Sequence, residues 1–133
     1  MVSLRQFFVA TAVMEAAAGV GLLMAPTVVI ALLLAGPVTN SHVALGRLAG
    51  AALLSLGAAC WWARTDAGSA ASRALVVGMS VYNGAVIAVV LAGSFGSLGR
   101  PILWVVTLVH GAMTAWCLSL LRSPKYRGAS EMR

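Results

Sequence analysis

The sequence is poor in charged residues, and above all in acidic ones. Of its 133 residues only 9% are charged and three are acidic, whereas 61% are hydrophobic. A soluble domain carries about 25% charged residues, and a chain this short cannot hide so much apolar surface from water. The composition therefore argues against a water-soluble domain and predicts a protein that faces the lipid bilayer.

The motifs of soluble enzymes are also missing. There is no Walker loop, no GxGxxG after a strand, no CxxC and no supported Ser-His-Asp arrangement. These absences favour a protein that is not an enzyme, and leave an enzyme acting on a lipid or quinone as the least favoured alternative. Cys60 and Cys117 lack metal-site or redox spacing, and we expect buried thiols without a disulfide. The net charge of +6 does not indicate nucleic acid, because the basic residues gather at the ends of apolar runs.

Four apolar segments are long enough to cross a hydrocarbon core, which takes about 20 helical residues. They cover residues 6–25, 42–63, 74–92 and 102–121. In lipid each segment must satisfy its own backbone, which favours helix, and the short alternating segments of a barrel are absent. The sequence predicts an all-α integral membrane four-helix bundle, up-down-up-down, with one domain over residues 1–122 and a cytoplasmic basic tail over residues 123–133.

A proline and a turn separate the first two spans. Pro26 is expected to end or kink the first helix, since proline lacks an amide hydrogen and clashes with the preceding turn. The stretch TVVIALLLAG after it is too short to span, and predicts a short interfacial helix on the outer side or a kinked extension. The stretch GPVTNS is a predicted turn in which Asn40 or Ser41 caps the next helix.

Lysine and arginine placement predicts the orientation. With both termini inside, Arg100 alone lies in an outer loop and Arg47 lies within a span. The cytoplasmic basic residues are then Arg5, Arg64, Arg73, Arg122, Lys125, Arg127 and Arg133. This bias predicts a multi-pass membrane protein with both termini cytoplasmic.

Each span carries one strongly polar residue. At a rise of 1.5 Å per residue, Glu15 and Asn83 lie about 14 Å from the inner side, and His110 lies about 12 Å from the outer side. Arg47, five residues into its span, can extend its long side chain toward the same level. Because ionisable groups in a span are costly and turn inward, we expect a buried ion pair between Glu15 and Arg47 within one four-residue ligand-binding cluster.

Two other interpretations of these residues are a purely structural role, which stays open, and haem or metal binding, which is disfavoured. In the structural interpretation the cluster binds no ligand. Its interhelical contacts, worth about 0.6 kcal/mol each, then only determine which helix packs against which. A haem would need His42 as second ligand, about 12 Å from the level of His110, and methionines in apolar helices are usually filler. We therefore expect no cofactor and no metal.

Small residues recur four apart in three of the spans, a spacing that lets helices approach closely. The pairs are Gly46 and Gly50, Ala17 and Gly21, and Gly84 and Ala88. We expect them to pack within one bundle, with a homodimer or a larger membrane complex as the alternative.

Several short motifs resemble a known group of proteins. The early glutamate, LLMAP ending the first span, LGRLAGAALLSLGAACW in the second, YN in the third and LWVVTLVHG in the fourth resemble small, uncharacterised four-helix bacterial inner-membrane proteins of the DoxX-like group. The resemblance implies a four-helix bundle of the bacterial inner (cell) membrane, associated with quinone-linked or oxidative-stress membrane complexes. Glu15 in VMEAAAG is also similar to the first-helix glutamate of small multidrug resistance transporters, whose later aromatic and glycine motif is not evident here.

The sequence thus predicts a small integral membrane protein surrounded by membrane lipid. Its cluster of Glu15, Arg47, Asn83 and His110 would bind the polar head of a small or lipid-like ligand, such as a quinone or another apolar small molecule, or anchor a partner subunit. The alternative is a proton-coupled small-molecule transporter in which Glu15 or His110 titrates.

Overall fold

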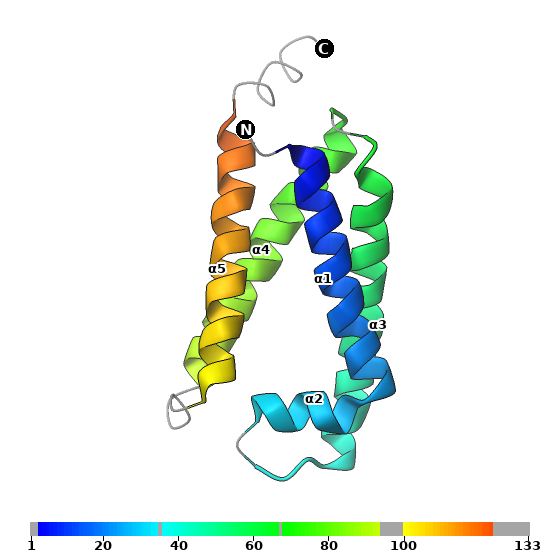
Figure 1. The fold of residues 1–133 in the computed structure, drawn as a ribbon, viewed down its shortest axis with the longest axis vertical. Coiled ribbons are helices and arrows are strands. Elements are labelled where there is room, and N and C mark those ends of the chain that lie inside the picture. The colour runs from blue at the N-terminus through cyan, green and yellow to red at the C-terminus, as the bar shows by residue number, and fades with distance from the viewer. Residues whose placement is uncertain (1–2, 35, 67, 94–99, 124–133) are drawn as a thin grey trace. The chain divides into compact units, whose positions relative to one another are not determined.

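The computed structural model of the protein describes residues 3–34, 36–66, 68–93 and 100–123, and every regular element within them is an α-helix. The helices are α1 (Leu4–Met24), α2 (Pro26–Leu33), α3 (Asn40–Ala63), α4 (Ala70–Gly93) and α5 (Pro101–Arg122) (Figure 1). Four of them, α1, α3, α4 and α5, are long and apolar enough to cross a membrane. The predicted all-helical class and its four long apolar segments are confirmed.

The chain divides into two compact units, Met1–Thr65 and Asp66–Arg133. The helices α1, α2 and α3 belong to the first unit, and α4 and α5 belong to the second. The single domain predicted over residues 1–122 stays a prediction. The predicted basic tail lies outside the described residues, apart from Ser123.

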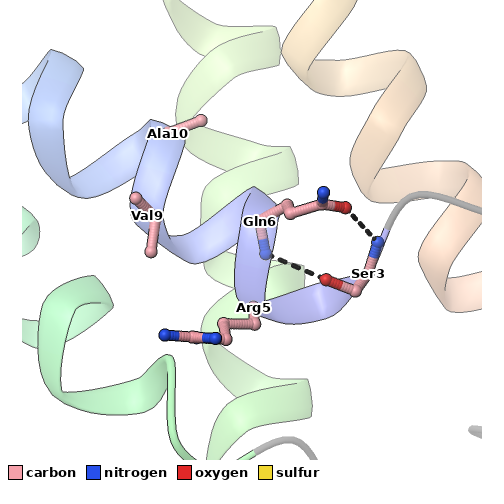
Figure 2. Close-up of a pocket in the computed structure, with 5 residues that line it drawn as sticks. All are labelled: Ser3, Arg5, Gln6, Val9 and Ala10. Atoms are coloured by element: carbon pink, nitrogen blue, oxygen red, sulfur yellow. Dashed lines mark hydrogen bonds between the residues drawn. The ribbon is translucent and has the colours of Figure 1, made fainter.

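The first helix begins and ends where local chemistry requires it. At its start the amide of Ser3 donates to Gln6 Oε1 (2.8 Å) and the amide of Gln6 donates to Ser3 Oγ (3.3 Å), so two otherwise unpaired amides are satisfied (Figure 2). At its end, Pro26 becomes the first residue of α2, a position where its missing amide hydrogen costs nothing. Figure 1 shows α2 running across the axis of α1, so the prediction that Pro26 ends the first helix is confirmed.

The start of α3 differs from the prediction. Thr39 is the cap, and its hydroxyl accepts from the amide of His42 (3.4 Å), while His42 Nδ1 accepts from the amide of Thr39 (3.2 Å). The predicted caps, Asn40 and Ser41, are wrong because His42 stands three residues after Thr39, where its ring completes the reciprocal pair.

In the first unit, α1 and α3 lie antiparallel with their backbones in close contact (Figure 1). A Cβ atom built on Gly19 would lie 2.8 Å from the carbonyl oxygen of Gly50, and one built on Gly50 would lie 2.8 Å from that of Gly19. Further along, a Cβ on Gly57 would lie 3.1 Å from both Ala12 O and Ala16 N. Glycine is required at this seam because any side chain would separate the helices.

The predicted small-residue pairs differ in how closely they are packed. Gly46 does take part in close packing, since a Cβ there would lie 2.7 Å from Ile30 Cδ1 of α2. Ala17, by contrast, is exposed, and a Cβ on Gly84 would meet no atom within 4 Å. Close packing at Gly46 and Gly50 is confirmed, whereas packing through the Ala17 and Gly84 pairs stays a prediction.

In the second unit, α4 packs against α5 through one face of each helix. The buried residues of α4 follow one another at intervals of four, three and four: Ser72, Val76, Met79 and Asn83. Those of α5 follow at four and three: Met113, Cys117 and Leu120. This alternation is typical of antiparallel helices that pack along a narrow seam, and it ends at the level of Asn83 and His110.

Candidate functional site

Two of the four predicted site residues meet in the second unit. His110 Nδ1 of α5 lies 2.7 Å from Asn83 Oδ1 of α4, although 27 positions separate them in the chain. Asn83 is 1% exposed and His110 is half-buried, so this hydrogen bond is largely shielded from competing solvent.

A second hydrogen bond fixes the direction of the first. Asn83 Nδ2 donates to the carbonyl oxygen of Met79 (2.7 Å), which leaves Asn83 Oδ1 facing the ring of His110. Because an amide oxygen can only accept, His110 Nδ1 must carry the hydrogen and donate it. A neutral imidazole has one N–H, so His110 Nε2 keeps its lone pair, and it has no hydrogen-bond partner among the described residues.

The described neighbours of His110 do not donate a hydrogen bond to its Nε2 atom, so Nε2 stays available as an acceptor. The hydroxyls of Thr107 and Thr114, one turn before and one turn after His110, donate to the carbonyl oxygens of Leu103 and His110 within α5 (2.8 Å each). Like other hydroxyls inside apolar helices, they donate their hydrogens to carbonyl oxygens of their own helix, and so have none left to donate to another helix. The ring of Tyr82 meets the His110 ring nearly edge-on, with centroids 5.8 Å apart.

Glu15 lies in the first unit on a buried face of α1. It is 4% exposed, and Thr11, one helical turn earlier, is fully buried. Thr11 Oγ1 has no hydrogen-bond partner among the described residues. Hydroxyls elsewhere inside the helices donate to a carbonyl one turn back, as at Ser55, Ser80, Thr107 and Thr114.

The predicted ion pair between Glu15 and Arg47 is wrong. The Cβ of Glu15 lies next to Gly57, ten residues along α3 from Arg47, which is an axial separation of about 15 Å. Arg47 is exposed and forms no ion pair or hydrogen bond within the described part of the chain. The glycine seam explains this, because placing Gly50 against Gly19 fixes the register of α3 and carries Arg47 past Glu15. The common level of all four predicted residues stays a prediction.

A tryptophan ring and an arginine side chain lie together at the end of α3. The Arg64 guanidinium lies 3.8 Å from the centre of the Trp61 ring and donates to the carbonyl oxygen of Trp61. The hydroxyl of Thr65 donates to the carbonyl oxygen of Trp62 (3.3 Å). These bonds satisfy carbonyls that the end of a helix leaves unpaired. The run WWAR could have signalled this, because arginine four residues or fewer after a tryptophan can fold back over it.

Each of the two cysteines lies on a long helix, Cys60 on α3 and Cys117 on α5. Cys60 and Cys117 are buried and form no disulfide, as expected. Within the ranges that the structure describes, no three residues of the His, Cys, Asp and Glu types gather closely enough to hold a metal ion. The Nδ1 of His42, considered as a second haem ligand, is engaged by the amide of Thr39.

Comparison with known protein families, with curated proteins and with solved structures finds no match. The resemblances to DoxX-like proteins and to small multidrug resistance transporters therefore stay predictions. Function has to be inferred from the geometry of the described residues.

Proposed function

We propose that this chain is a multi-pass membrane protein that binds an amphipathic small molecule through His110. Its four spans would be α1, α3, α4 and α5, with α2 at the outer surface and both termini cytoplasmic. The apolar length of these helices and the gathering of arginines at one set of ends support this placement. The exposed Trp62, near the end of α3, and Trp104, near the start of α5, stand where interfacial tryptophans belong. The bacterial inner membrane is suggested by the sequence resemblance alone.

The hydrogen bond between His110 and Asn83 carries the functional part of this proposal. The carbonyl oxygen of Met79 orients the Asn83 amide, and the amide oxygen of Asn83 orients the His110 ring. The Nε2 lone pair of the ring therefore points away from Asn83. Polar groups inside a span are expensive and are usually kept for function. A ring fixed in one tautomer by a buried amide is a pre-organised acceptor, and it suits a ligand that brings an O–H group.

This chemistry separates two forms of a quinone-like ligand. A quinol presents hydroxyls that can donate to His110 Nε2, whereas a quinone presents only carbonyl oxygens, which cannot donate to a lone pair. One added hydrogen bond contributes about 0.5–1.5 kcal/mol, so we expect the reduced form to bind about two- to tenfold more tightly.

Native mass spectrometry of the protein in lipid nanodiscs, loaded under nitrogen with decylubiquinol or decylubiquinone, tests the proposal. His110→Asn keeps an amide near the position of Nδ1 but has no group at Nε2, and should lose the preference for the quinol. The matched control is His42→Asn, which changes the other histidine and leaves an acceptor for the amide of Thr39. Equal binding of both forms by the wild type, or an unchanged preference in His110→Asn, would contradict the proposal.

A second candidate is proton-coupled transport, which the burial of Glu15 favours. A carboxyl group that is 4% exposed on an apolar helix of 21 residues can carry a proton without an ordinary aqueous environment. Proteoliposomes with an imposed pH gradient and a pH-sensitive dye inside test this candidate. Proton flux driven by a cationic substrate should be lost in Glu15→Gln, and an unchanged flux in that variant would exclude Glu15 as the carrier.

A further inference from the structure

The hydrogen bond to Asn83 engages the same ring nitrogen of His110 in both charge states of the ring. His110 Nδ1 lies 2.7 Å from Asn83 Oδ1, and the Asn83 amide is itself held by its bond to the carbonyl oxygen of Met79 (2.7 Å). An amide oxygen accepts and cannot donate, so Nδ1 carries a hydrogen in the neutral ring and in the imidazolium alike. Any proton that the ring gains or loses is therefore gained or lost at Nε2, the atom that faces the proposed ligand.

Within the described residues of α4 and α5, the groups close to the His110 ring carry no charge. The Tyr82 ring meets it nearly edge-on, and phenols ordinarily stay neutral below about pH 10. The thiol of Cys117 is two turns away along α5. The charged side chains lie toward the helix ends, ten or more residues from His110 or from Asn83: Arg73, Arg100 and Arg122. In this part of the chain, His110 is therefore the group whose charge can change near neutral pH.

The proton at Nε2 decides which ligand groups can bond to the ring. In the neutral ring Nε2 only accepts a hydrogen bond, and in the imidazolium it only donates one. A quinol hydroxyl can donate or accept, so a quinol forms this bond in either state. A quinone carbonyl can only accept, so a quinone forms it with the imidazolium alone, and that bond is strengthened by the charge of the ring.

We propose that this site binds a quinone together with one proton, whereas it binds the quinol without one. Water supplies the proton, which forms an N–H bond at His110 Nε2, and neither electrons nor covalent bonds of the ligand change. The inference rests on the proposed function, because it concerns the same ligand class at the same atom. By linkage, a quinone that binds the imidazolium more tightly must shift the ring toward that form by the same factor.

The protonation of the ring is measured first. Solid-state ¹⁵N NMR in lipid bilayers, with histidine labelled in a His42→Asn background, gives the fraction of His110 rings that carry a hydrogen on both nitrogens. At the pH where this fraction is one half without ligand, saturating decylubiquinone should raise it to about nine tenths, which is about a tenfold change in the ratio of charged to neutral rings. Decylubiquinol under nitrogen should change that ratio by less than about threefold.

Native mass spectrometry in nanodiscs, at pH values on either side of this titration, measures the affinities. Decylubiquinone should bind about tenfold more tightly on the acidic side, in His42→Asn as in the wild type, and His110→Asn should lose this difference. A quinone affinity that stays constant while the ring gains its proton would overturn the inference, as would an equal pH dependence in His110→Asn or a ring still neutral at about pH 4. These results would leave the proposed function standing, whereas failure of both ligands to bind at every pH would remove both.

Discussion

Replacing Gly50 by alanine tests whether the backbones of α1 and α3 touch. The added Cβ would lie 2.8 Å from the carbonyl oxygen of Gly19 and 3.0 Å from Leu22 Cβ. Both atoms belong to the rigid part of α1, so no flexible side chain can move away to make room. Since carbon atoms pack best at about 3.5–4.0 Å, the two helices must separate by about 0.5 Å or more.

The expected loss of stability follows from that separation. A gap of about 0.5–1 Å forfeits a quarter to a half of the dispersion energy at each neighbouring contact of the seam. Overpacked sites of this kind typically cost about 1–3 kcal/mol, which exceeds the gain of up to about 1 kcal/mol from placing alanine instead of glycine in a helix. Gly50→Ala should therefore unfold more easily than the wild type.

Gly78→Ala is the matched control on α4. A Cβ at Gly78 would meet no atom within 4 Å, so the helix should be unchanged or stabilised by up to about 1 kcal/mol. Equilibrium unfolding in mixed micelles of dodecyl maltoside and SDS, followed by circular dichroism, measures both variants. If Gly50→Ala is as stable as Gly78→Ala, the close approach of α1 to α3 at Gly19 is refuted.

Two further predictions concern polar residues inside the helices. Thr11→Val should leave stability unchanged or raise it, because the buried hydroxyl has no partner in the described residues, whereas Thr107→Val should lower it by about 0.5–1.5 kcal/mol through loss of its bond to the helix backbone. Unfolding in mixed micelles measures both, and a loss in Thr11→Val as large as that in Thr107→Val would show that the Thr11 hydroxyl is bonded after all. Glu15→Gln and Arg47→Gln should have effects on unfolding that add to within about 0.5 kcal/mol, because about 15 Å along the axis of α3 separates the two residues. A coupling energy above 1 kcal/mol in the double variant would restore the ion pair.

The elements of this fold could largely be predicted from the sequence. Long apolar runs leave helix as the only conformation that satisfies the backbone in lipid, and all four predicted segments fall within the observed helices to within a few residues at their ends. Pro26 acts through its own covalent structure, so its effect needs no tertiary information. The cap at Thr39 was missed because the partner that completes it, His42, is a histidine and not the usual glutamate or glutamine.

The choice of helix face could not be predicted in the same way. Small residues four apart occur on several faces of these helices, and the spacing at Ala17 and Gly21 is as regular as that at Gly46 and Gly50. What distinguishes them is the surface of the neighbouring helix. In α1 the contact instead uses Ala12, Ala16 and Gly19, which a count of small residues on one helix does not single out.

The candidate site shows the same limit for polar residues. Opposite charges made Glu15 and Arg47 the obvious pair, but the register of α1 on α3 is set by backbone contact at Gly50, and attraction between two side chains does not change it. Asn83 and His110 pair because the seam between α4 and α5 brings them to one level. Counting residues from the helix ends gives the position of a residue along the helix axis, but it does not tell on which face of the helix the residue lies.

The tautomer of His110 is the most direct test of this account. Solid-state ¹⁵N NMR of the protein in lipid bilayers, labelled at histidine in a His42→Asn background, observes the two ring nitrogens of His110 alone. The account predicts a hydrogen on Nδ1, a bare Nε2, and loss of that preference in Asn83→Leu. A hydrogen on Nε2 in the neutral ring, or a spectrum that Asn83→Leu leaves unchanged, would contradict it.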